Sequence, residues 1–171
     1  LMDLKGKIRE IQDFPKEGIS FKDVTTLLAD GEAYAYAIDK MLASVEDVEF
    51  DVVLGPEARG FLIGAPIAYA ARKEFVPVRK PGKLPYETYR FEYELEYGTD
   101  VLEIHKDAIK PGARVLIADD LLATGGTVES IIRMVKEFGA EVVGCVFLIE
   151  LSFLNGREKL GGCRAESLVF Y

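Results

Sequence analysis

Two adjacent carboxylates, Asp119 and Asp120, are followed closely by a loop of small residues. The loop consists of Ala123, Thr124, Gly125, Gly126 and Thr127. A glycine loop that leads into a helix presents unpaired backbone N–H groups and the positive end of the helix dipole, which together bind anions. Because no lysine precedes Thr127, the loop does not match the nucleoside-triphosphate motif, and a single phosphate is the better ligand. We call residues 123–127 the phosphate loop.

The two acids would repel a phosphate that they touched. We therefore expect Asp119 and Asp120 to lie one sugar length from it, where a carboxylate accepts hydrogen bonds from a vicinal diol or holds a hydrated Mg²⁺. A phosphate at one end and a diol at the other describe ribose 5-phosphate. The alternative is an ordinary turn between a strand and a helix, with acids at the strand end.

Apolar residues on both sides of the loop predict the elements that position it. The run Val115–Ala118 is wholly apolar, which is typical of a strand buried on both faces. After the loop, apolar residues recur at spacings of three and four and predict an amphipathic helix. These residues are Val128, Ile131, Ile132, Val135 and Phe138. Gly139 is placed to end the helix.

A second glycine-bounded loop, Gly55–Phe61, lies between a predicted strand at Asp51–Leu54 and a predicted helix that runs through Ala71. Arg59 within this loop suits phosphate oxygens, because its planar guanidinium can donate two parallel hydrogen bonds. A structural ion pair between Glu57 and Arg59 is the competing interpretation.

The densest positive cluster of this acidic chain follows a predicted strand at Phe75–Arg79. It consists of Arg79, Lys80 and Lys83 on a turn stiffened by proline and glycine. Charge runs are usually solvated, but three cations on a stiff turn suit a diphosphate.

The segment from Tyr86 to Gly98 is rich in charged and aromatic residues. Its strict alternation predicts a hairpin arm or a mobile lid. The alternating residues are Tyr89, Phe91, Tyr93, Leu95 and Tyr97. The single histidine, His105, has no nucleophile or metal-ligand partner nearby in the sequence, so we assign no catalytic role to it.

Strands and helices alternate along the rest of the chain. We expect helices over residues 3–12 and Ala33–Val45, a loop over Phe14–Asp23, strands at Val101–Ile104 and Val142–Ile149, and an edge strand within Gly161–Tyr171. This order predicts an α/β fold with a mostly parallel twisted sheet flanked by helices. Ligands of such sheets bind at the carboxyl edge, where both loops would lie.

The 171 residues are expected to form a single domain, 1–171. A net charge of −8 argues against nucleic acid or an anionic membrane as a partner. Two cysteines, Cys145 and Cys163, do not make a disulfide framework, and no apolar run is long enough to span a membrane. We therefore expect a cytoplasmic protein.

The segment Val115–Thr127 resembles the phosphoribosyl-diphosphate (PRPP) binding motif of the type I phosphoribosyltransferases. Four further segments resemble the adenine phosphoribosyltransferases of that family: FPKEGISFKD at 14–23, GPEARGF at 55–61, RKPGKLP at 79–85 and LEYG at 95–98. The resemblance keeps the order of the motifs along most of the chain. It implies transfer of ribose 5-phosphate from PRPP to adenine, with Mg²⁺, giving AMP and diphosphate in purine salvage.

The resemblance also implies roles for individual residues. The phosphate loop would bind the 5-phosphate, and Asp119 and Asp120 the ribose diol or Mg²⁺. The implied diphosphate contacts are Arg59, Lys80, Lys83 and Arg79. In the family the last of these reaches the neighbouring subunit's site, so a homodimer is implied.

Two further regions are assigned by the same resemblance. An N-terminal hood of about residues 1–30 would cover the base through Ser20, Phe21 and Lys22, although Ser20 stands where the family usually has an aliphatic residue. The implied catalytic residues are Glu96 and Tyr97, on a mobile loop of about residues 84–100, together with Arg59. Glu96 would take the N9 proton of adenine, with a Mg²⁺-bound ligand as the alternative base.

Other functions remain open at this point. The same fold could use hypoxanthine, guanine or xanthine instead of adenine. A non-catalytic PRPP sensor would need a basic surface and no catalytic loop, which the acidic charge and Glu96 argue against. A receiver-like domain could use Asp119 and Asp120 for Mg²⁺, but it would have no use for the phosphate loop.

Overall fold

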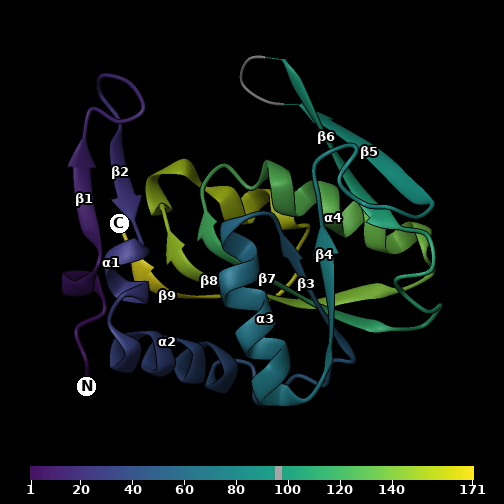
Figure 1. Cartoon of the computed structure of the whole chain (residues 1–171), viewed down its shortest axis with the longest axis horizontal. Helices are drawn as coiled ribbons and strands as arrows, with labels where there is room; N and C mark the ends of the chain where they lie inside the picture. The colour runs from purple at the N-terminus through teal and green to yellow at the C-terminus, as the bar shows by residue number, and fades with distance from the viewer. Residues whose placement is uncertain (95–97) are drawn as a thin grey trace.

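The computed structural model describes residues 1–94 and 98–171 of the chain. A sheet of five parallel strands in the order β4-β3-β7-β8-β9 forms its centre (Figure 1). The strands are β3 (Val52–Pro56), β4 (Glu74–Val78), β7 (Arg114–Leu122), β8 (Glu141–Glu150) and β9 (Ala165–Phe170). The predicted α/β fold with a parallel sheet is confirmed, and β9 is the edge strand expected in the C-terminal segment.

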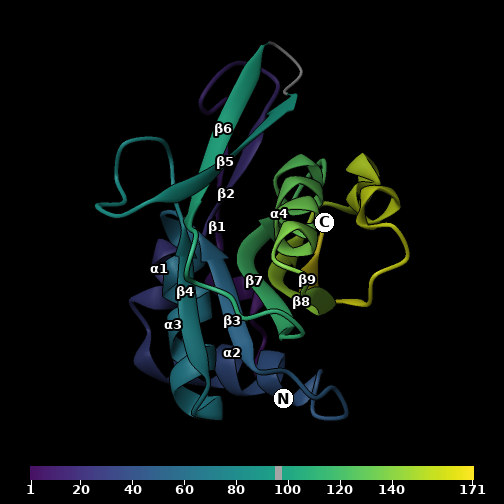
Figure 2. The same ribbon diagram turned by 90° about the vertical axis from the view of Figure 1, so that its right-hand side faces the viewer.

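Helices cover both faces of this sheet (Figure 2). Helices α2 (Gly31–Ala43) and α3 (Arg59–Ala71) pack on one face, and α4 (Gly126–Glu137) packs on the other. Side chains of β7 alternate between the two cores. Leu116 and Ala118 join the cluster under α2 and α3, whereas Val115 and Ile117 join the cluster under α4. The strand is therefore buried on both faces, as its continuous apolar run predicts.

Helix α4 has the amphipathic pattern that the sequence predicts. Val128, Ile131 and Val135 are buried, and the polar side of the helix faces away from the sheet. The helix ends before Gly139, whose φ of 70° is the left-handed conformation of a C′ glycine. The backbone N–H of Gly139 closes the last turn by donating to Lys136 O at 2.9 Å.

The N-terminal segment differs from the helix predicted over residues 3–12, and that prediction is wrong. The chain forms a short 3₁₀ turn, η1 (Lys5–Lys7), and then a strand, β1 (Arg9–Gln12), that pairs antiparallel with β2 (Ser20–Asp23). Cross-strand ion pairs stabilise this hairpin, because Arg9 opposes Asp23 and Lys22 opposes Glu10. The predicted loop over 14–23 is correspondingly shorter. The short helix α1 (Thr25–Leu28) follows.

A second antiparallel hairpin joins β5 (Thr88–Glu94) to β6 (Thr99–His105). It confirms the hairpin arm predicted from the alternating residues. The tip, residues 95–97, lies outside the described part of the chain, so the predicted lid motion stays a prediction. The two hairpins rise beyond the same edge of the sheet, one beside β9 and the other beside β4 (Figure 1). None of the helices in the described ranges has the length and hydropathy of a membrane span.

Candidate active site

A cavity of about 240 Å³ opens at the carboxyl edge of the sheet, beside the hairpin of β5 and β6. Three separate parts of the chain line it: residues 56–60 after β3, residues 119–128 around the start of α4, and the side that carries Lys80, Tyr93 and Leu102. The two glycine loops predicted as anion sites thus meet in a single cavity. Their meeting follows from β3 and β7 being neighbours in the sheet with the same direction.

The phosphate loop enters α4 through Gly125, which has a φ of 86°. This conformation strains any residue with a side chain, and a β-carbon at Gly125 would also lie 2.5 Å from the carbonyl oxygen of Gly156. Glu129 donates its backbone N–H to Gly125 O at 2.9 Å, the first turn of the helix. The first N–H groups of a helix have no partner within it, and the loop residues that carry them here line the cavity.

The two acids lie within β7, because the strand continues beside β8 as far as Leu122. The expectation that they follow the strand end is therefore wrong, although both line the cavity. Asp120 is buried and binds Arg59, with 3.0 Å between Oδ2 and Nε. Asp119 accepts the backbone N–H of Asp120 at 2.8 Å, and burial together with the charge of Asp120 raises its pKa well above the ordinary value.

Arg59 contacts both Asp120, a predicted ribose contact, and Phe21, a predicted base contact. Its guanidinium binds Asp120 and lies 5.5 Å from the ring centre of Phe21. The ion pair between Glu57 and Arg59, the competing interpretation of this loop, is not formed. Arg59 lies in the cavity wall, and 44% of its side chain is exposed to solvent.

Glu57 instead organises the positive cluster, a role that sequence reasoning missed. Its carboxylate accepts hydrogen bonds from Arg79 Nε at 3.2 Å, from the backbone N–H of Lys80 at 2.7 Å and from Lys83 Nζ at 2.6 Å. The ammonium of Lys80 pairs with Asp100. Lys80 lines the cavity, whereas Arg79 and Lys83 do not line it and instead contact Glu57, which does.

The three predicted base contacts do not share one direction, because β2 alternates its side chains. Phe21 faces Phe14, with ring centres 5.2 Å apart, and Arg59. Lys22 donates to Ser20 Oγ and to Glu10, both at 2.9 Å, and lies over the Tyr171 ring. Phe21 is therefore the side chain of this trio that the structure connects to the cavity wall.

Glu96 and Tyr97 lie outside the described residues. Other cavity residues were not predicted from the sequence as site residues. Tyr93 could have been found, because the alternation of its strand places it on the inner face, where it donates to Asp100 Oδ2 at 3.1 Å. Gly60 could not have been found, because its role is to leave space for a carboxylate. A β-carbon at this position would lie 2.9 Å from Asp119 Oδ1.

A cavity that joins an anion-binding loop, paired acids and clustered cations at the carboxyl edge of a parallel sheet is the site of a protein that handles phosphorylated sugars or nucleotides. In agreement, the phosphoribosyl transferase domain family matches residues 24–160. The chain belongs to this family.

Within it, the chain groups with the adenine phosphoribosyltransferases. The Clostridium tetani protein of that name is 64% identical over 170 residues, covering 99% of each chain. The crystal structure of the Thermoanaerobacter pseudethanolicus enzyme superposes with a TM-score of 0.96 at 55% identity and 98% coverage of both chains. The Saccharomyces cerevisiae enzyme, complexed with an imino-altritol bisphosphate and adenine, has a TM-score of 0.89 at 38% identity, covering 96% of this chain and 95% of its own.

Proposed function

We propose that this protein transfers ribose 5-phosphate from PRPP to N9 of adenine and releases AMP and diphosphate. The observation that carries the proposal is the single cavity in which the phosphate loop, Asp120 and Arg59 meet. The full-length relatives named for this activity support it. The yeast enzyme's complex with adenine and a bisphosphate supports the same pair of ligand classes.

The charges of the site suit the reaction. As the bond from C1′ to diphosphate breaks, the sugar becomes cationic and negative charge grows on the diphosphate. Lys80 at the cavity wall and Lys83 beside Glu57 are placed to stabilise that charge, and Arg59 adds a guanidinium between the acids and Phe21. Phe21 offers an apolar face for a purine ring. Glu96 remains our candidate for the base that removes the N9 proton.

Magnesium would supply further stabilisation of the diphosphate when bound. Asp119 and Asp120 provide the carboxylate oxygens that Mg²⁺ prefers. The described residues contain no group of three His, Cys, Asp or Glu side chains placed to hold a metal. Asp119 and Asp120 would therefore hold the ion together with oxygens of PRPP.

We also propose that the protein is a cytoplasmic homodimer in which Arg79 contributes to the neighbouring site. Exposed Leu62 and Tyr69, one heptad apart on α3, offer an apolar contact surface for a second copy. Arg79 lies 5.8 Å from the ring centre of Phe61 near the start of the same helix. The free thiols of Cys145 and Cys163 suit a reducing compartment.

The proposal is tested by incubating the purified protein with PRPP, Mg²⁺ and each purine base in turn. We expect adenine to be preferred over hypoxanthine by up to ~10⁴ in kcat/KM, because a site that pairs with the 6-amino group leaves a buried group unmatched by a 6-oxo base. Comparable turnover of hypoxanthine would exclude adenine specificity. PRPP binding without turnover of any base would favour a sensor.

A further inference from the structure

The phosphate loop rests against a second piece of backbone, the start of the 3₁₀ helix η3 (Gly156–Leu160). A β-carbon at Gly156 would overlap the carbonyl oxygen of Ala123 and lie 3.1 Å from the side chain of Leu122. In the same way, a β-carbon at Gly125 would overlap the carbonyl oxygen of Gly156. The loop and Gly156 are therefore in direct backbone contact at two points, so neither can shift without moving the other.

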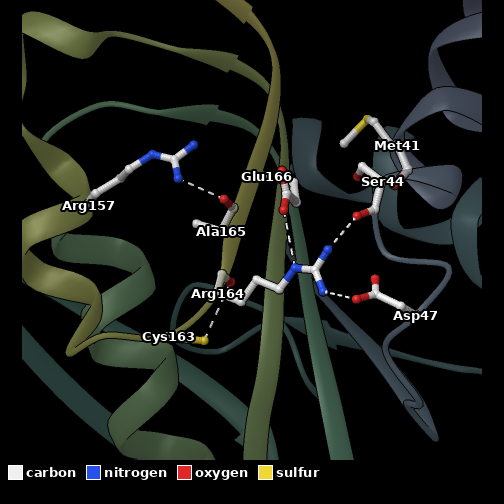
Figure 3. Close-up of polar contacts among 8 residues, drawn as sticks. All are labelled: Met41, Ser44, Asp47, Arg157, Cys163, Arg164, Ala165 and Glu166. Atoms are coloured by element: carbon white, nitrogen blue, oxygen red, sulfur yellow. Dashed lines mark hydrogen bonds and ion pairs between the residues drawn. The ribbon is translucent and has the colours of Figure 1, made fainter.

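Arg157, the next residue, fixes the position of Gly156. Its guanidinium makes two parallel hydrogen bonds to Glu150, from Nε at 2.7 Å and from Nη2 at 2.8 Å. A third bond runs from Nη1 to the carbonyl oxygen of Ala165 at 2.7 Å, and Figure 3 shows this bond reaching β9. The bonds tie η3 to two adjacent strands of the sheet. A bidentate contact of this kind restricts orientation as well as distance.

Glu150 is a firm anchor for that contact. It lies at the end of β8, is 6% exposed, and accepts a further hydrogen bond from Ser167 Oγ at 2.6 Å. The guanidinium of Arg157 lowers the pKa of Glu150 below its ordinary value, so the pair stays ionised. At the far end of η3, Leu160 is buried in the core beside α4. Both ends of the short helix are therefore held.

We propose that Arg157 is a positioning residue for the 5-phosphate of PRPP. Its bonds to Glu150 and Ala165 hold Gly156, and Gly156 holds the phosphate loop in the conformation that presents its N–H groups. The inference rests on the proposed function for the identity of the phosphate ligand. Because the proposed base contact is Phe21, which lies beside Arg59, the effect should fall on PRPP and not on the base.

Arg164 offers a matched control on the same edge of the sheet (Figure 3). It also makes three bonds, to Glu166 Oε1 at 3.1 Å, to Asp47 Oδ2 at 2.7 Å and to the carbonyl oxygen of Ser44 at 2.9 Å. These bonds lead to the end of α2 and away from the phosphate loop. Replacing either arginine removes one guanidinium and its three hydrogen bonds, but only Arg157 is the neighbour of Gly156 in the chain.

The test compares Arg157→Met with Arg164→Met in steady-state kinetics. We expect Arg157→Met to raise the KM for PRPP by about tenfold to a hundredfold, the effect of a misplaced binding group, with little change in the KM for adenine. Arg164→Met should leave both constants near those of the wild type. Arg157→Lys, which keeps the charge but not the bidentate bond, should fall between them. Equal PRPP KM values for the two Met variants would overturn the proposal.

Gly156→Ala tests the same contact without removing a charge, in case Arg157→Met does not fold. Gly31→Ala is its control, because a β-carbon at Gly31 meets nothing within 4 Å. We expect only Gly156→Ala to weaken PRPP binding, and an unchanged PRPP KM in this variant would also contradict the proposal.

Hydrogen exchange separates this inference from the proposed function. Residues 122–127 should exchange faster in Arg157→Met than in Arg164→Met even if the wild type turns over no purine base. Equal exchange rates in the two variants would overturn the proposal that Arg157 positions the phosphate loop. Unequal exchange rates together with a wild type that turns over no purine base would overturn only the proposed reaction.

Discussion

Asp120→Asn separates binding from stability at one carboxylate. Asp120 is 5% exposed, and its structural partner is Arg59, which is nearly half exposed. An ion pair with one solvated member contributes about 0–1 kcal/mol to folding, and asparagine keeps the volume of the side chain and an acceptor for Arg59. Burial and the charge of Asp120 raise the pKa of Asp119, and the substitution removes the second of these causes. We therefore expect the free energy of unfolding to change by about 1 kcal/mol or less, which corresponds to about 2–4 °C in Tm for a domain of this size.

The effect on PRPP binding should be larger. A hydrogen bond from a ribose hydroxyl to a carboxylate contributes about 1.5–3 kcal/mol, and losing the charge forfeits most of it. This corresponds to an increase of about 10- to 150-fold in the dissociation constant or KM for PRPP. Steady-state kinetics with varied PRPP and a thermal unfolding scan measure both quantities on the same preparation. Asp107→Asn, which changes an exposed carboxylate after β6, is the control and should alter neither.

Two results would refute this reasoning. An unchanged PRPP KM would show that Asp120 does not contact the sugar. A loss of about 3–5 kcal/mol in stability would show that Asp120 behaves as a buried structural charge whose pairing the fold requires.

Two further predictions concern other carboxylates. Glu57→Gln removes the negative charge that competes with diphosphate for Lys83, so the inhibition constant of diphosphate against PRPP should fall by about fivefold, corresponding to about 1 kcal/mol of screened pairing; an unchanged or higher constant would show that the charge of Glu57 does not compete with the ligand. Hydrogen bonds from Thr25 and Arg9 lower the pKa of Asp23 to about 2 from the ordinary 3.8. The ionised side chain therefore contributes its full stabilisation at a pH above its pKa in the unfolded chain, and this stabilisation is lost as the pH falls toward about 2. Urea unfolding should therefore show Asp23→Asn to be less stable than the wild type at neutral pH, with the difference shrinking in acid, and a difference independent of pH would contradict this assignment.

The parts of the site that the sequence predicts are those encoded locally. Val115–Ala118, the phosphate loop and α4 are contiguous, and each has its own signal: an apolar run, paired glycines and a stripe at helical spacing. The same reasoning failed at residues 3–12, because Leu4, Ile8 and Ile11 are spaced as on a helix. The partner that makes this segment a strand, β2, lies beyond a turn, and pairings across a turn leave little trace in a periodicity.

Contacts between distant segments were outside the reach of the sequence. Glu57 looks like a partner for its near neighbour Arg59, yet the parallel pairing of β3 with β4 brings the turn after β4 closer to it. Gly156 carries no local signal, because its importance comes from the loop that packs against it. Sequence reasoning therefore predicted the groups that meet in the cavity better than it predicted the groups that hold them in place.

The pairing of every site cation with a protein carboxylate has a consequence for turnover. Lys83 is held by Glu57, Lys80 by Asp100 and Arg59 by Asp120. Each cation is between a third and a half exposed, whereas the side chains of Asp120 and Glu57 are 7% and 10% exposed, so breaking one pair costs at least the ~0–1 kcal/mol of an exposed pair, and a charge-assisted bond to a phosphate oxygen contributes about 1.5–3 kcal/mol. If these cations bind diphosphate as proposed, we expect them to exchange a carboxylate for a phosphate oxygen on binding. We then expect the carboxylates to take the cations back when diphosphate leaves, which would lower the cost of releasing a highly charged product from an acidic protein.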